Sequence, residues 1–181
     1  MVRMGKSLSE RVALGGIVAA LCIVLMFLTG VMPALYIAAP MIAGMLMIIL
    51  AEEVSVPWAW LTYTAVSLLA LIVSFDKEAA LMFILFFGYY PILRPSLEKL
   101  RPGILRFCVK MVLYNLFLAA DVMITVYVLG LPSFDDYRRG MMITLAVMAN
   151  FLFVCYDKLL SRMRWFYRKI FVKRVLGKHR R

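Results

Sequence analysis

Six long apolar runs follow one another along this chain, and they restrict its possible folds more than any other feature. Each run approaches the roughly 20 residues that an α-helix needs to cross the hydrocarbon core of a bilayer. None shows the period of 2 that marks a half-buried strand or the period of 3.6 that marks a surface helix of a soluble protein. The runs are residues 12–32, 35–51, 57–75, 79–93, 104–130 and 140–156. The sequence therefore predicts an all-α polytopic membrane protein, a six-helix transmembrane bundle.

The composition and the breaks between runs agree with this prediction. Hydrophobic residues make up 65% of the 181 residues and charged residues only 17%, whereas soluble domains average about half apolar and a quarter charged. Turn-forming residues separate the runs at Pro33, 52–57, 76–78, 91–102 and 132–139. The second and fourth runs are short, so we expect tilt or a recessed end there.

Three segments follow from this division of the chain. We expect a basic cytoplasmic N-terminus at residues 1–11, the transmembrane domain at 12–157 and a basic amphipathic tail at 158–181. The first run is long enough to span the membrane, and no cleavage site of small residues follows it. We therefore expect it to be retained rather than removed as a signal peptide.

Basic residues concentrate in alternate connections, which predicts an orientation. Lys and Arg are frequent in residues 1–11, 94–106 and 158–181, and the last of these segments contains no acid. The connections on the other side hold Lys77 and an arginine pair that two aspartates offset. Cytoplasmic loops carry the excess of Lys and Arg, so both termini are predicted to be cytoplasmic.

The tail has apolar side chains at helical spacing with basic residues around them. This pattern is typical of a helix that lies at the surface of an anionic leaflet, and Trp165 and Tyr167 favour that position. Basic residues with interleaved aromatics also suit nucleic acid, but behind six membrane helices we expect no nucleic-acid partner. The plainer interpretation of the tail is a topology anchor.

The residues that build most catalytic sites are absent. The one histidine, His179, is in the tail, so neither a Ser/His/Asp triad nor a histidine metal site can be assembled. Cys22, Cys108 and Cys155 lie in three different runs without CxxC spacing and are interpreted as small core residues. We expect no enzyme activity, no cofactor and no metal.

Asp121 is the one charged residue between positions 111 and 131. A carboxylate in hydrocarbon is costly unless it is paired or hydrated, so it marks a functional site by default. At about 100° per residue, Tyr114, Asp121 and Thr125 share one helix face, and Asn150 places an amide near the middle of the last run. Such faces would enclose a polar cavity. The alternative for Asp121 is a hydrogen bond between helices, worth about 0.6 to 2 kcal/mol.

A second group of charges lies where the fourth helix is expected to begin. Asp76 and Glu78 suit an N-cap and the positive end of the helix dipole. Lys77 is left as an ammonium at the mouth of the proposed cavity, and Tyr127 is an aromatic residue that could pack on the apolar part of a ligand.

The first helix contains overlapping pairs of small residues spaced four apart, Gly15 with Ala19 and Gly16 with Ala20. Such pairs let another backbone approach closely. Together with Pro33 after the first helix, the sequence Ala-Pro-x-x-Ala-Gly in the second and six spans in 181 residues, they resemble the S components of energy-coupling factor transporters.

The resemblance implies partners and a location. In that family the S component captures a vitamin or similar micronutrient from outside, and two cytoplasmic ATPases drive its reorientation through a transmembrane T component. It implies docking on the T component at Gly15, Gly16, Ala19 and Ala20. It also implies a substrate site in the outer halves of the last three helices, and the cytoplasmic membrane of a bacterium as the location.

Both lines of reasoning lead to one hypothesis, a substrate-binding subunit of a micronutrient uptake transporter. Its predicted substrate-binding residues are Asp121, Thr125, Asn150, Lys77, Tyr114 and Tyr127. One alternative is a non-transporting membrane scaffold of envelope or cell-shape machinery, with the first helix and the tail as partner surfaces. Another is a proton-coupled carrier, for which Asp121 has no partner acid or histidine to form a relay.

Overall fold

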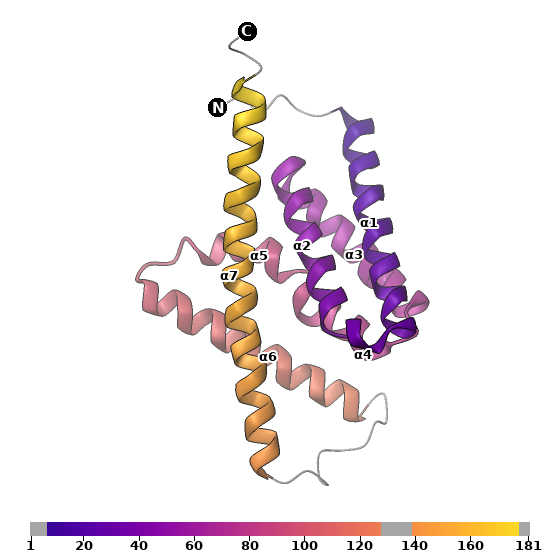
Figure 1. The fold of residues 1–181 in the computed structure, drawn as a ribbon, viewed down its shortest axis with the longest axis vertical. Helices are drawn as coiled ribbons and strands as arrows, with labels where there is room; N and C mark the ends of the chain where they lie inside the picture. Colours follow the sequence, from indigo (N-terminus) through magenta and orange to yellow (C-terminus); the bar gives the residue numbers. More distant parts are fainter. Residues whose placement is uncertain (1–6, 128–138, 178–181) are drawn as a thin grey trace. The chain divides into compact units, whose positions relative to one another are not determined.

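The computed structural model describes residues 7–127 and 139–177, and these residues form only helices and short connections (Figure 1). They divide into two compact units, Met1–Pro132 and Ser133–Arg181, each of which is described by itself. The predicted all-helical fold is confirmed for the described residues. Residues 1–6, all but the last residue of the turn predicted at 132–139, and His179 lie outside them.

Helix α1 (Leu8–Val31) begins at a capping box. Ser7 Oγ accepts a hydrogen bond from the backbone amide of Glu10 at 3.3 Å, and the Glu10 carboxylate accepts one from the amide of Ser7 at 2.9 Å. This exchange satisfies two amides that the first turn leaves without helical partners. The helix ends before Pro33, which starts the short helix η1 (Pro33–Leu35).

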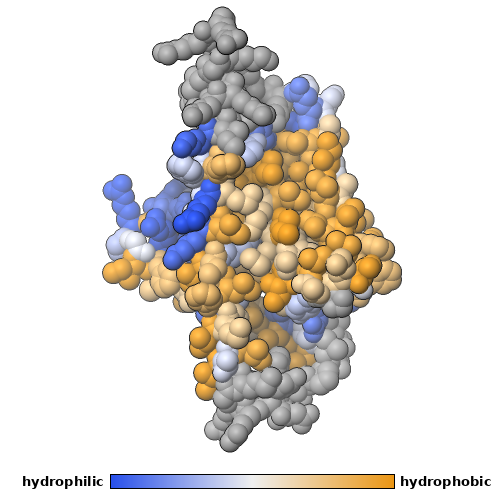
Figure 2. Space-filling model, viewed as in Figure 1, coloured by the Kyte–Doolittle hydropathy of each residue, from blue (hydrophilic) through white to orange (hydrophobic). Residues whose placement is uncertain are grey.

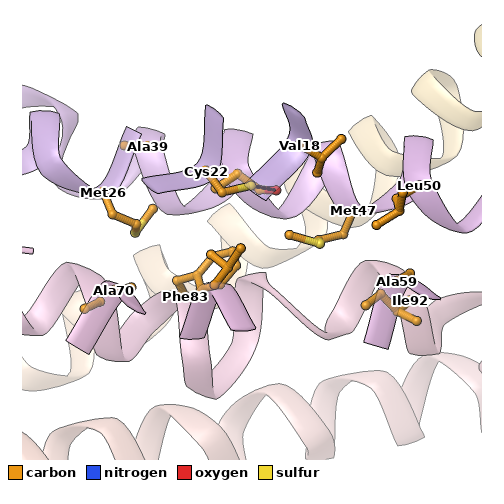
Figure 3. Close-up of a cluster of buried hydrophobic side chains, with 13 residues drawn as sticks. Val18, Cys22, Met26, Ala39, Met47, Leu50, Ala59, Ala70, Phe83 and Ile92 are labelled. Atoms are coloured by element: carbon orange, nitrogen blue, oxygen red, sulfur yellow. Dashed lines mark hydrogen bonds between the residues drawn. The ribbon is translucent and has the colours of Figure 1, made fainter. Parts of the chain in front are cut away.

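Helices α2 (Ala38–Glu53) and α3 (Val56–Val73) pack against α1 and against each other. Small residues let these backbones approach closely, because Ala39 and Ala43 of α2 and Ala59 and Ala70 of α3 are fully buried. Figure 3 shows the larger side chains that fill the remaining space, with Phe83 between the residues of these helices.

The fourth run forms one nearly continuous helical segment made of α4 (Lys77–Met82), η2 (Phe83–Phe87) and α5 (Tyr90–Leu97). The break predicted at 91–102 begins later, after Leu97, because Pro91 occupies the first turn of α5, where its missing N–H costs no helical hydrogen bond. Arg94 therefore lies in a helix and not in a loop. It is buried, and its Nη2 forms an ion pair with Oε1 of Glu98 at 2.6 Å.

Helix η2 is a π-helix, in which the amide of Gly88 donates to the carbonyl of Phe83 at 2.7 Å. In an α-helix that amide would bond to Ile84 instead. The hydroxyl of Tyr63 on α3 donates to the Ile84 carbonyl at 2.7 Å. A Cβ on Gly88 would lie only 2.7 Å from Cε2 of Tyr63, so this contact requires glycine at position 88.

Helix α6 (Gly103–Tyr127) completes the first unit and packs on α4 and η2. Figure 1 shows that it runs obliquely to α1, α2 and α3. Aromatic side chains of α6 contact η2 and the turn that precedes α5. The ring centroids of Phe86 and Tyr114 are 5.0 Å apart, and those of Tyr89 and Phe117 are 5.2 Å apart, both in edge contact.

The second unit contains α7 (Arg139–Gly177), a single helix of 39 residues. It runs without interruption through Asp157 and Lys158. The last predicted run, 140–156, and the predicted tail helix are therefore parts of one helix.

Within residues 7–127 and 139–177, five helical segments are long and apolar enough to cross a membrane. They are Leu8–Val31, Val56–Val73, Lys77–Leu97, Gly103–Tyr127 and Ile143–Tyr167. Helix α2, with 16 residues, is shorter. The outer face of α1 exposes large apolar side chains, among them Val12, Ile17 and Val24, and Figure 2 shows this apolar surface. The described helices are thus compatible with a multi-pass membrane protein.

Candidate functional site

At one end of the first unit, the connection between α1 and α2 meets the start of α4. Asp76 is the N-cap of α4, and its Oδ1 accepts hydrogen bonds from the amides of Glu78 at 3.1 Å and Ala79 at 3.2 Å. The N-cap predicted for Asp76 is confirmed. The hydroxyl of Ser74 donates to the carbonyl of Asp76 at 2.8 Å and lies 3.2 Å from the carbonyl of Met26, so the end of α3 lies against α1.

Tyr36 lies in the turn between η1 and α2, and its hydroxyl donates to Oε2 of Glu78 at 2.7 Å. Burial raises the pKa of the Tyr36 hydroxyl, and the hydrogen bond to Glu78 and the charges of Glu78, Asp121 and Asp76 raise it further. Tyr36 is therefore a neutral donor to the carboxylate at any physiological pH.

Asp121, on α6, belongs to the same group of side chains. It lies near enough to Glu78 for their charges to interact. The charge of Asp121 also reaches the hydroxyl groups of Tyr36 and Tyr114. Its Oδ1 is shielded from solvent and has no hydrogen-bond partner in the described part of the chain. A buried acceptor without a donor costs about 1 to 3 kcal/mol, and more when it is charged.

These side chains form a site with excess negative charge. Glu78 and Asp121 repel each other when both are ionised, and Tyr36 supplies one hydrogen-bond donor to Glu78. A ligand that brings a positive charge and an N–H donor would relieve both the repulsion and the unpaired acceptor. The arrangement therefore suits an ammonium or guanidinium group.

The other predicted residues of α6 lie at different distances from the core. Tyr114 is buried two turns before Asp121, where it contacts Phe86. Thr125 is half-buried one turn after Asp121. Tyr127, at the last position of α6, is 82% exposed. The structure thus groups Asp121 with Tyr114 and leaves Tyr127 at the surface.

Lys77 has a local role at the end of α3. Its Nζ donates to the carbonyls of Leu71 at 2.7 Å and Ser74 at 2.8 Å. The last carbonyls of a helix have no helical partner, and a cation there also meets the negative end of the dipole. This geometry makes Lys77 a cap of α3.

Asn150 belongs to the second unit, in which its Nδ2 donates to the carbonyl of Ala146 one turn earlier at 2.9 Å. That bond lies within α7. The structure therefore assigns Asn150 a hydrogen bond to a residue of its own helix.

The structure separates the two predicted docking pairs of α1. Gly15 is buried, and a Cβ there would lie 3.5 Å from Oγ1 of Thr62 on α3. Ala19 is half-buried against the core. Gly16 and Ala20 are exposed, and a Cβ on Gly16 would meet nothing within 4 Å. Only the second pair faces outward.

Sequence reasoning did not include Tyr36 and Glu78 among the site residues. Tyr36 stands among apolar residues with no pattern around it, and Glu78 has a sufficient explanation as an acid in the first turn of a helix. Their hydrogen bond joins positions 42 residues apart, so only the packing of the first unit reveals it.

Aromatic side chains fill the region beside Tyr114. Tyr89 lies at their centre, with its ring stacked on Trp60 at 6.4 Å and in edge contact with Tyr63 at 6.2 Å. The described residues include no group of three or more His, Cys, Asp or Glu side chains that could hold a metal ion. The site therefore combines an acidic group of side chains with neighbouring aromatic rings.

No protein-family model, no curated protein and no solved structure matches this chain.

Proposed function

We propose that this chain is an integral membrane protein that binds a small cationic ligand between Tyr36, Glu78 and Asp121, and that it is the substrate-binding subunit of a micronutrient uptake transporter. The observation that carries the proposal is Oδ1 of Asp121, which is shielded from solvent, has no hydrogen-bond partner among the described residues and lies within range of the charge of Glu78. A carboxylate pair is a costly way to make a packing contact between apolar helices, whereas it binds a cation well.

The membrane part of the proposal rests on the five long apolar helices and on α2 as a sixth, shorter span. Positive charge in the segments 1–11, 94–106 and 158–181 supports cytoplasmic termini. The turn that holds Tyr36 and the turn before α4 then lie on the outer side. Asp121 lies toward the same side, because α6 leaves the cytoplasmic segment 94–106 at Gly103 and places Asp121 near its far end.

The chemistry of the site narrows the class of micronutrient. Glu78 and Asp121 favour a molecule with an ammonium, quaternary ammonium or guanidinium group, and the aromatic rings near Tyr114 suit an apolar or aromatic part of the same molecule. Two carboxylates repel an anionic substrate and weaken its binding by several kcal/mol, so the site would select cations over anions.

Docking on a coupling subunit would use the outer face of α1. In this proposal Gly16 and Ala20 allow close approach of a partner helix, and exposed Ile17 and Val24 flank them. Gly15 and Ala19, by contrast, support the packing of α1 within the chain. The ATPases that drive transport would be separate subunits.

A thermal-shift screen of the purified protein in detergent tests the ligand class. The probes are the cations thiamine, choline and putrescine and the anions pantothenate and nicotinate. We expect at least one cation to raise the midpoint of unfolding, because a ligand that binds only the folded state stabilises it. Stabilisation by anions alone would contradict the cationic site.

The scaffold alternative predicts a different set of results. A scaffold of envelope or cell-shape machinery would lose its partners when residues 158–181 are deleted, and it would show no stabilisation by any small molecule. The transporter subunit retains its stabilisation by the cation after the same deletion.

A further inference from the structure

One exposed stripe of α7 changes its chemistry along its length. Lys158, Arg162, Trp165 and Lys169 are exposed and, at about 100° per residue, fall within about 60° of one another. Trp165 is 62% exposed, and Nζ of Lys169 lies 4.6 Å from the centroid of its ring. This group of four residues is the basic stripe.

The same stripe is apolar in the preceding turns. Val147 is 64% exposed, Phe151 is 70% exposed and Cys155 is also exposed, and all three lie on the face that continues into Lys158. A face that is apolar for several turns and then basic and aromatic matches the passage from hydrocarbon to headgroups at the edge of a bilayer.

The depth of the basic stripe agrees with this interpretation. A span that starts near Gly140 needs roughly 20 residues at about 1.5 Å each, and it ends near Leu159. Arg162 and Trp165 then fall in the headgroup layer, and Lys158 reaches it by extending its stem. Because α7 is continuous, this segment leaves the bilayer together with the span and does not lie flat on the surface.

We propose that the basic stripe binds the headgroups of anionic phospholipids around α7 where the helix leaves the membrane. Three exposed cations, with no acid in residues 158–181, complement the negative charge of such lipids. Nucleic acid would use the same cations and stack on Trp165, but it would leave the apolar part of the stripe unexplained. The inference rests on the membrane insertion proposed above and is independent of the ligand of Asp121.

Quenching of Trp165 fluorescence by brominated lipids tests the proposal. The full chain with Trp58→Phe and Trp60→Phe keeps Trp165 as its single tryptophan and is reconstituted in bilayers of phosphatidylcholine and phosphatidylglycerol, with bromine on one lipid at a time. We expect phosphatidylglycerol to quench with at least about a threefold preference. That preference should fall to about one in Arg162→Gln/Lys169→Gln and remain in the control Lys99→Gln/Arg101→Gln.

Two outcomes overturn the proposal. Equal quenching by both lipids shows that the stripe lies in the membrane surface without selecting anions. Absence of quenching by either lipid shows that Trp165 is not at the bilayer.

A second measurement avoids the tryptophan substitutions, in case they prevent folding. The protein with all its tryptophans is purified in mild detergent, and the retained lipid is quantified. We expect the ratio of anionic to zwitterionic lipid to fall at least about twofold in Arg162→Gln/Lys169→Gln and not in the control. An unchanged ratio contradicts the proposal, and neither experiment depends on the cation bound at Asp121.

Discussion

The hydroxyl of Tyr36 donates a hydrogen bond to Oε2 of Glu78 at 2.7 Å, across 42 positions of the chain. It joins the turn between η1 and α2 to the first turn of α4, and it places a neutral donor beside a carboxylate that also interacts with the charge of Asp121. This one contact both holds an end of the first unit together and defines the polar side of the candidate site.

Tyr36→Phe is expected to lower the free energy of unfolding by about 1.5 to 3 kcal/mol, because it leaves a half-buried charged acceptor without its donor. The measurement is unfolding by SDS in mixed micelles. In a Glu78→Gln background the same substitution should cost clearly less. Equal costs in both backgrounds would mean that the two side chains do not interact.

Stability is expected to fall as the pH rises above about 10, the usual pKa of tyrosine in an unfolded chain. The pKa of Tyr36 is raised in the folded protein, so above pH 10 the unfolded chain loses this proton while the folded chain keeps it. The stabilisation is therefore complete below that pH and is lost as the pH rises toward the folded value. Tyr36→Phe should weaken this fall in a series of unfolding midpoints from pH 8 to 11.

Gly88→Ala is expected to destabilise the protein by about 1 to 3 kcal/mol, because the new Cβ would lie 2.7 Å from Cε2 of Tyr63 and 2.9 Å from Cζ of Phe83. Both rings belong to packed aromatic contacts and have little room to move. The matched control is Gly16→Ala, whose Cβ meets nothing within 4 Å. It should leave stability unchanged or raise it by up to about 1 kcal/mol. If the two variants had the same unfolding midpoint, this would contradict the close approach of Tyr63 to Gly88.

Lys77→Met is expected to cost about 0.3 to 1 kcal/mol, the value of a cation at a helix C-terminus. The substitution removes the hydrogen bonds to the carbonyls of Leu71 and Ser74. Binding of the cationic ligand should be unaffected, which a thermal-shift titration checks. A large loss of binding would mean that Lys77 contacts the ligand, as the sequence alone predicts.

The helical class of the fold could be predicted because apolar runs near the length of a bilayer crossing allow few other structures. The ends of helices were harder to predict. Pro91 falls within the predicted break at 91–102, yet a proline in the first turn of a helix costs no helical hydrogen bond. The continuity of α7 was missed because the composition changes at Lys158 while the backbone does not.

The candidate site could be predicted only in part. Asp121 stands out in any apolar run, and its helical spacing to Tyr114 follows from the geometry of one helix. Its neighbours Tyr36 and Glu78 come from segments far away in the sequence, and no periodicity connects them. The sequence alone suggests that Lys77 contacts the ligand. Its hydrogen bond to the carbonyl of Leu71, at the end of α3, depends on the path of the turn between α3 and α4, which the sequence does not specify.

The amount of small molecule that co-purifies with the protein tests the central claim most directly. Mass spectrometry of wild-type protein should find a cationic molecule, and its amount per mole of protein should fall at least about tenfold in Asp121→Asn, which removes one charge of the pair. Glu53→Gln, at the opposite end of α2 from Tyr36, removes an acid elsewhere and should retain the molecule. A cation retained equally by all three proteins, or an anion in its place, would contradict the account.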